Sequence, residues 1–80
     1  MREIEFKMEN EHEEIREGAT VEVEEGYLQD GLVVYYIIVP AIAMSGNFKR
    51  QEALKERTGR VSAIRRDEAG AFYVKVDFEG

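Results

Sequence analysis

Apolar and polar residues alternate along several short stretches of this chain, a pattern that is typical of β-strands with one buried face. The clearest stretch is residues 71–78. Its apolar residues share one face: Phe72, Val74, Val76 and Phe78. Residues 60–66 precede it, and the turn-forming residues 67–70 join the two into a predicted hairpin. Residues 19–25 alternate in the same way and form another predicted strand.

Residues 2–8 fit two patterns. Alternation with charged residues indicates a strand whose apolar side carries Ile4, Phe6 and Met8. Helical spacing is also present in Ile4, Met8, His12 and Ile15. We favour the strand, because Phe6 has no place on the helical stripe. Residues 10–15 then form a predicted short turn of helix, which Asn10 caps and Gly18 ends.

The segment 32–39 is the strongest strand signal, since branched and aromatic residues occupy both of its faces. One face carries Val33, Tyr35, Ile37 and Val39, and the other carries Val34, Tyr36 and Ile38. We therefore predict a central strand that is covered on both sides. Residues 27–31 are a predicted turn before it, and Pro40 ends its pairing.

Residues 47–58 are the only candidate for longer helical structure. Asn47 is a good N-cap, the following residues are mostly helix formers, and Gly59 is a suitable stop. We predict a short helix or a long loop here, and a helix over residues 48–54 would cover one face of the 32–39 strand. The whole chain, residues 1–80, is then one mainly β domain of about five antiparallel strands. A small sheet of this kind removes its edges best by curling into a barrel.

Composition narrows the class of protein. The chain has 80 residues, of which 44% are hydrophobic, and it contains no cysteine. A disulfide scaffold, a thiolate metal site and a cysteine nucleophile are therefore excluded. No signal peptide is visible, and the longest uncharged stretch, residues 32–48, is too interrupted to span a membrane. We expect a cytoplasmic protein with no membrane partner.

Charge is distributed unevenly along the chain. The formal net charge is −6, but residues 1–31 hold three basic and eleven acidic residues, a net of −8. Residues 32–48 are uncharged, and residues 49–80 hold eight basic and six acidic residues, a net of +2. The basic residues concentrate in 49–66, where the net charge is +5. Whether the acidic and basic segments meet in the fold decides whether this charge is available to a ligand.

Two stretches resemble the small SH3-like barrels, particularly the KOW-type variety of ribosomal and transcription proteins. The first runs from Ile15 to Val23 and contains a glycine turn followed by an alternating strand. The second runs from Gly59 to Ile64 and continues through an acidic-glycine turn into residues 72–76. The resemblance implies a barrel with a binding role and identifies no ligand. We also expect a chain of this kind among small bacterial or phage proteins.

Catalytic and metal-binding patterns are incomplete. The segment from His12 to Arg16 starts like a zinc-protease motif, but Arg16 stands where the second histidine is required. Neither Ser45 nor Ser62 lies in a pattern that would bring it to the single histidine. The acid pairs Glu13/Glu14 and Glu24/Glu25 are predicted to be solvated on polar faces. We therefore predict no enzyme activity, no cofactor and no metal site.

Two binding roles remain. We predict a non-enzymatic binding or regulatory module that contacts a protein partner, or a second copy of itself, through an apolar and aromatic strand. The predicted contact residues are Val33, Tyr35, Tyr36, Ile38 and Phe48. The alternative is a nucleic-acid-binding barrel, because guanidinium groups match phosphate and aromatic rings stack on bases. Its predicted anion-binding residues are Lys49, Arg50, Lys55, Arg57, Arg60, Arg65 and Arg66.

Overall fold

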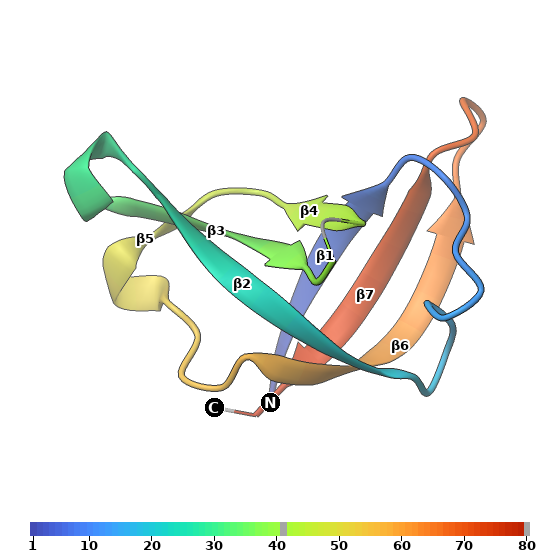
Figure 1. The fold of residues 1–80 in the computed structure, drawn as a ribbon, viewed down its shortest axis with the longest axis horizontal. Helices are drawn as coiled ribbons and strands as arrows, with labels where there is room; N and C mark the ends of the chain where they lie inside the picture. The colour runs from blue at the N-terminus through green and yellow to red at the C-terminus, as the bar shows by residue number, and fades with distance from the viewer. Residues whose placement is uncertain (41, 80) are drawn as a thin grey trace.

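The computed structural model describes residues 1–40 and 42–79, and these residues form a mainly β structure with two single-turn 3₁₀ helices (Figure 1). In chain order the elements are β1 (Arg2–Met8), β2 (Thr20–Leu28), η1 (Gln29–Gly31), β3 (Val33–Ile38), β4 (Ala43–Ser45), β5 (Phe48–Lys49), η2 (Arg50–Glu52), β6 (Thr58–Arg66) and β7 (Phe72–Phe78). The five long strands match the five predicted ones. The predicted total was too low, because the described residues also contain the short strands β4 and β5.

All strand pairs are antiparallel, and their order is β2-β6-β7-β1-β4-β3-β5 with an additional pairing of β2 to β3. Strand β2 pairs with β6 along its first part and with β3 along the rest. Residues 20–22 pair with β6, and residues 23–28 pair with β3. The pairings therefore form a closed circuit of six strands, with β5 attached to β3 outside it. In Figure 1, β2 crosses the front of the molecule and continues with β3 into a hairpin arm that ends at η1.

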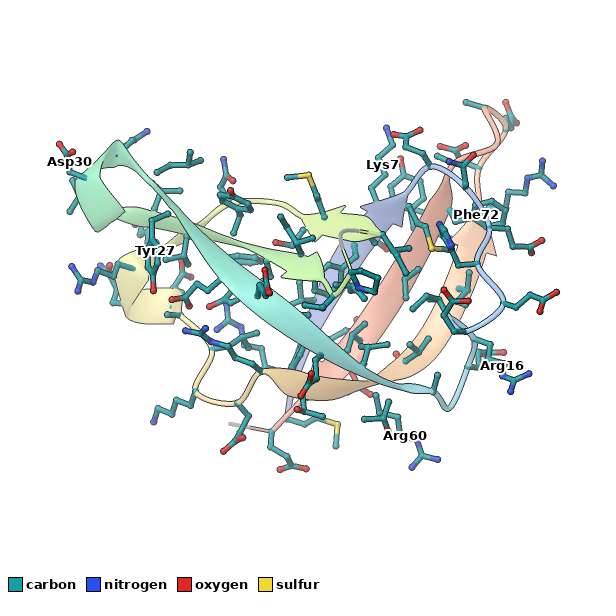
Figure 2. All side chains as sticks on the ribbon, viewed as in Figure 1. Lys7, Arg16, Tyr27, Asp30, Arg60 and Phe72 are labelled. Carbon is teal, nitrogen blue, oxygen red and sulfur yellow. The ribbon has the colours of Figure 1, made fainter. Side chains whose placement is uncertain are left out.

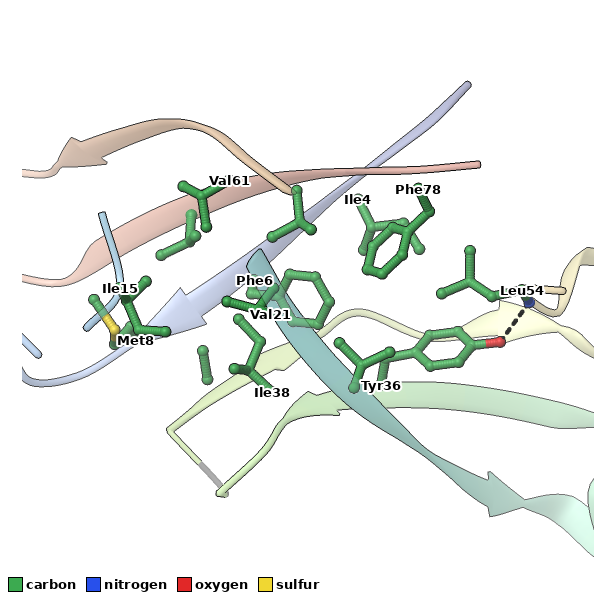
Figure 3. Packing of buried hydrophobic residues seen from close by; sticks show 14 of the residues in the cluster. Ile4, Phe6, Met8, Ile15, Val21, Tyr36, Ile38, Leu54, Val61 and Phe78 are labelled. Atoms are coloured by element: carbon green, nitrogen blue, oxygen red, sulfur yellow. Dashed lines mark hydrogen bonds between the residues drawn. The ribbon is translucent and has the colours of Figure 1, made fainter. Parts of the chain in front are cut away.

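The inner sides of the strands meet in a single apolar core (Figure 3). Because side chains alternate along a strand, every second residue of β1 and β7 faces this core. Phe6 and Phe78 lie near its centre with ring centroids 6.4 Å apart. The buried residues of the core are Ile4, Phe6, Met8, Ile15, Val21, Val23, Val34, Tyr36, Ile38, Ala43, Leu54, Val61, Val74, Val76 and Phe78. The alternation seen in the sequence thus selects the core side of β1, of the first part of β2 and of β7 correctly.

The predicted strand 2–8 and the predicted C-terminal hairpin are both confirmed. In the hairpin turn, a carboxylate oxygen of Asp67 accepts a hydrogen bond from the backbone N–H of Ala71 at 3.0 Å. Gly59 is buried where β6 approaches β7 closely. A Cβ atom there would lie 2.8 Å from the backbone oxygen of Asp77 and 2.6 Å from a methyl group of Val76. Only glycine fits this contact without displacing backbone.

The predicted helix within residues 47–58 is wrong. Phe48 pairs with Val34 in the sheet, and only Arg50–Glu52 form a single 3₁₀ turn. In an α-helix the N–H of Leu54 would bond to the carbonyl of Arg50 four residues earlier. It instead donates to the phenolic oxygen of Tyr36 at 2.6 Å, and Leu54 enters the core. A long-range contact therefore outweighs the local helix propensity, and the long-loop alternative is closer to the structure.

Two smaller expectations are also corrected. The 10–15 segment contains turns but no helix, with the N–H of Ile15 donating to the carbonyl of His12. The predicted turn at 27–31 begins only at Gln29, because residues 27 and 28 continue β2 and pair with β3. No helix among the described residues has the length and apolar character required to cross a membrane.

Candidate protein-binding surface

The structure divides the five predicted partner-contacting residues between two sides of the sheet. Tyr36 and Ile38 have no exposed surface and belong to the core, so the prediction that they contact a partner is wrong. Phe48 is half-buried on the core side, where its ring centroid lies 6.3 Å from that of Tyr36 and the Arg2 guanidinium stacks on it. Val33 and Tyr35 point to the outside and are half-exposed. The strand 32–39 is thus covered fully on one side only.

The outward side chains of β3 belong to a larger apolar surface. Directly opposed residues on neighbouring strands point to the same side of a sheet. The register opposes Leu28 to Val33 and opposes Met44 to Ile37. Leu28 is 43% exposed and Met44 is 53% exposed. We call this surface the outer apolar face, and it consists of Leu28, Val33, Tyr35, Ile37 and Met44.

The sequence pattern predicts part of this face. Val33 and Tyr35 were predicted contacts, and Ile37 shares their side by alternation. Leu28 and Met44 were missed, since Leu28 fell in a predicted turn and β4 was not expected. Only the strand register places these two side chains beside β3.

Tyr35 lies across a glycine at the middle of the outer apolar face. Gly26 is its direct partner on β2, and a Cβ atom on Gly26 would collide with the Tyr35 ring. The ring therefore occupies the space that a side chain on β2 would otherwise fill.

Gly26→Ala is expected to displace the Tyr35 ring and to lower the free energy of unfolding by about 0.2–1 kcal/mol, the range of a cross-strand aromatic contact. The cost stays small because Tyr35 is half-exposed and can swing away. Gly46→Ala is the matched control, since nothing lies within 4 Å of a Cβ atom at that position. Urea denaturation of both variants measures the difference, and equal stabilities would contradict the packing.

The outer surface of β1, β7 and β6 has a different character. Acidic and basic side chains alternate across these strands and form exposed ion pairs. Lys75 lies 4.0 Å from Glu3, and Arg65 lies 3.8 Å from Glu5. The Arg65 guanidinium also stacks on the Tyr73 ring at 4.2 Å from its centroid. Mixed charges and apolar side chains thus occupy different parts of the outer surface of the sheet, and the apolar part described above lies on β2, β3 and β4.

The seven predicted anion-binding residues are spread over the molecule. Lys49 and Arg50 lie on β5 and η2, on the left of Figure 1, whereas Arg65 and Arg66 end β6 on the right. Figure 2 likewise shows Arg60 far from the tip of the hairpin arm at Asp30. Arg57 lies 3.3 Å from the Glu25 carboxylate, and Lys55 is exposed in the loop before β6. The structure does not gather these residues into one patch.

The acidic N-terminal segment and the basic C-terminal segment lie side by side. Strand β2 pairs with β6, and β1 pairs with β7. Two of the seven predicted anion-binding residues, Arg57 and Arg65, form ion pairs with acids of the first 31 residues. Part of the uneven charge along the chain is consequently neutralised within the fold.

One carboxylate of β2 is nearly buried. The side chain of Glu25 is only 6% exposed and accepts hydrogen bonds from the hydroxyls of Tyr27 and Tyr36, both at 2.6 Å. Arg57 donates to the same carboxylate at 3.3 Å, and Tyr36 in turn accepts from Leu54 (Figure 3). We call these five residues the Glu25 cluster. The prediction that Glu25 is solvated is wrong, because this cluster connects β2 and β3 to the segment before β6.

The cluster shifts two pKa values in opposite directions. Burial by itself raises the pKa of Glu25, but the hydrogen bonds from Tyr27 and Tyr36 and the positive charge of Arg57 outweigh it, so the pKa lies below its ordinary value. Burial and the neighbouring Glu25 carboxylate raise the pKa of Tyr36. Glu25 is therefore held ionised and Tyr36 neutral, an arrangement that favours a structural role.

The single histidine lies in a shallow surface hollow. His12 lines it together with Glu9, Asn10, Glu14 and Ile42, and its Nδ1 lies 3.8 Å from a Glu14 oxygen. Among residues 1–40 and 42–79, no three histidine, cysteine or acidic side chains come close enough to hold a metal ion. The hollow therefore offers one imidazole and loose carboxylates, a weak ligand set for zinc.

Comparison of the chain with protein-family models, with curated proteins and with solved structures finds no match. The candidate site therefore depends on the geometry of this chain. The outer apolar face is the strongest candidate, because it is the part of the described surface where several large apolar side chains meet in one sheet.

Proposed function

We propose that this chain is a non-enzymatic binding or regulatory module with a small SH3-like barrel, and that the outer apolar face binds a protein partner. The closed circuit of antiparallel pairings supports the barrel. A cytoplasmic location is part of the proposal and is supported by the lack of cysteine.

The single observation that carries the proposal is the contrast between the two parts of the outer surface. Mixed ion pairs occupy β1, β7 and β6, as is usual for a solvated surface. Leucine, valine, isoleucine, methionine and tyrosine side chains adjoin one another on β2, β3 and β4. Exposed contiguous apolar patches commonly mark interaction sites, and tyrosine and methionine are enriched at interface centres.

Site-specific photocrosslinking tests the partner contact. A p-benzoylphenylalanine is placed at position 35 in the outer apolar face, or at position 73 as the matched control. Both positions hold a half-buried tyrosine on the outer surface, but Tyr73 lies among the mixed charges. We expect a defined crosslinked adduct from position 35 and none from position 73 when the protein is illuminated in its own cells. Equal adducts at both positions, or none at either, would reject the proposal.

The nucleic-acid alternative stays a prediction. Its basic residues form no cluster in the described part of the chain, so no structural observation favours it over protein binding. Electrostatic binding of RNA or DNA would fall steeply as salt increases, which distinguishes it from apolar protein contact.

A further inference from the structure

The outer apolar face carries opposite charges at two diagonally opposite corners. Lys49 of β5 is the direct neighbour of Val33, and Glu24 of β2 is the direct neighbour of Ile37. Cross-strand neighbours point to the same side of a sheet, so both charges border the outer apolar face. Both residues are exposed, and neither forms an ion pair with any residue in the described ranges.

The two charges are placed nearly symmetrically about Tyr35. Val33 and Ile37 are four residues apart on β3, which corresponds to about 13 Å along the strand. Lys49 and Glu24 lie on opposite sides of β3, about 10 Å apart across the strands. Tyr35 is midway between these two corners. The corner at Met44 is bordered by Lys7, but the Lys7 ammonium lies 3.7 Å from the Glu9 carboxylate. Among the described residues the face therefore has an unpaired positive corner at Lys49, an apolar centre and an unpaired negative corner at Glu24.

We propose that the partner of this face is a second copy of the same chain, and that the two copies form a symmetric dimer. The inference rests on the proposed function and names its partner. The two-fold axis runs parallel to the face, between the two copies and above Tyr35, and is perpendicular to the line from Lys49 to Glu24. Rotation about it places Lys49 of each copy over Glu24 of the other and lays the two apolar centres against each other. Such an interface is self-complementary, as a two-fold dimer requires.

The apolar centre and the charged corners have different roles in this dimer. Burial of the apolar side chains supplies the affinity, because exposed ion pairs contribute little. The two Lys49–Glu24 pairs select the relative orientation, since rotating one copy within the interface breaks both pairs. Each copy carries a net charge of −6, so long-range repulsion opposes the dimer at low salt and is screened at physiological salt.

Analytical ultracentrifugation of variants that reverse the charge at position 49, at position 24 or at both tests the dimer. The chain is examined from about 1 μM to about 1 mM at physiological salt, a range that covers weak interfaces. Lys49→Glu or Glu24→Lys alone creates two like-charge contacts per dimer and is expected to raise the dimer dissociation constant about tenfold. The variant with both substitutions again has opposite charges at both contacts, with the signs reversed. It is expected to recover most of the affinity.

Control variants distinguish loss of the Lys49–Glu24 pairs from the effects of a changed net charge or of unfolding. Lys55→Glu and Glu13→Lys make the same changes in net charge at exposed positions outside the face, and we expect no comparable effect. Circular dichroism confirms that each variant remains folded. A chain that stays monomeric throughout, or a dimer that the single substitutions do not weaken, overturns the inference. So does failure of the variant with both substitutions to restore the dimer.

The photocrosslinking experiment distinguishes failure of the dimer from failure of the proposed function. An adduct between two copies at position 35 supports the dimer. An adduct at position 35 with a different protein, together with a monomeric chain, overturns the dimer and leaves the proposed function standing. A monomeric chain without any adduct overturns both.

Discussion

Tyr36→Phe is expected to lower the free energy of unfolding by about 1–3 kcal/mol, the usual cost of leaving a buried polar group unpaired. The hydroxyl of Tyr36 connects a backbone N–H to a nearly buried carboxylate. It accepts a hydrogen bond from the N–H of Leu54 and donates one to the Glu25 carboxylate, each at 2.6 Å. Water cannot easily replace it, because Tyr36 has no exposed surface. A domain of this size loses about 4–8 °C in Tm for each kcal/mol.

Tyr27→Phe is the matched control for this prediction. It removes the other phenol that donates to Glu25, but Tyr27 is 57% exposed and water can take its place. We expect the stability of this variant to stay within about 0.5 kcal/mol of the wild type, as for most surface substitutions. Amide hydrogen exchange adds a local readout, since the Leu54 amide should lose protection in Tyr36→Phe only. Equal destabilisation by the two substitutions would contradict the role assigned to Tyr36.

Glu25→Gln is expected to lower stability at neutral pH by about 1–3 kcal/mol and to flatten its dependence on acid pH. The pKa of Glu25 lies below its ordinary value of 4.5 in the folded protein. The unfolded chain therefore binds a proton at higher pH than the folded chain does. Wild-type stability from this group is complete above pH 4.5 and is lost as the pH falls through the lower folded pKa. The glutamine variant has no such loss, so the two curves should converge in acid.

Urea denaturation at a series of pH values between neutral and acid measures this convergence. Glu22→Gln is the control, because Glu22 is an exposed carboxylate on the same strand. Some pH dependence remains in every variant. Desolvation raises the pKa of Asp67, but hydrogen bonds from the backbone N–H groups of its turn, that of Ala71 first, outweigh it and lower that pKa. Parallel curves for wild type and Glu25→Gln down to acid pH would contradict the ionised Glu25 cluster.

Two segments, residues 2–8 and 47–58, each fitted two structures. The favoured one was correct for the first segment and the helix was wrong for the second, for a physical reason. The strand over residues 2–8 was predictable because Phe6, like Ile4 and Met8, needs a buried side, and alternation alone provides it. The helix near residue 50 was not, because local propensity competes there with sheet pairing by Phe48 and with the hydrogen bond from Leu54 to Tyr36. Neither of these contacts is visible in the local sequence.

The candidate site was likewise only partly predictable from the sequence. Alternation divided the side chains of the 32–39 strand into two sets, but it could not decide which set faces the core. Closure of the strand pairings decided this, by placing Val34, Tyr36 and Ile38 inside. The two members of the outer apolar face on β2 and β4, Leu28 and Met44, depend on register and were not predictable.

The positions of the long strands, and the apolar side of most of them, could be predicted from the amino-acid sequence, because the side chains of any β-strand alternate between its two faces. The composition also excluded cysteine chemistry. The pairing of the strands, the contact between the acidic and basic segments and the burial of Glu25 depend on long-range contacts in the folded chain. The hydrogen bonds of the Glu25 cluster show why. They join residues 18 and 32 positions apart, Tyr36 with Leu54 and Glu25 with Arg57, and such contacts exist only once the chain has closed on itself.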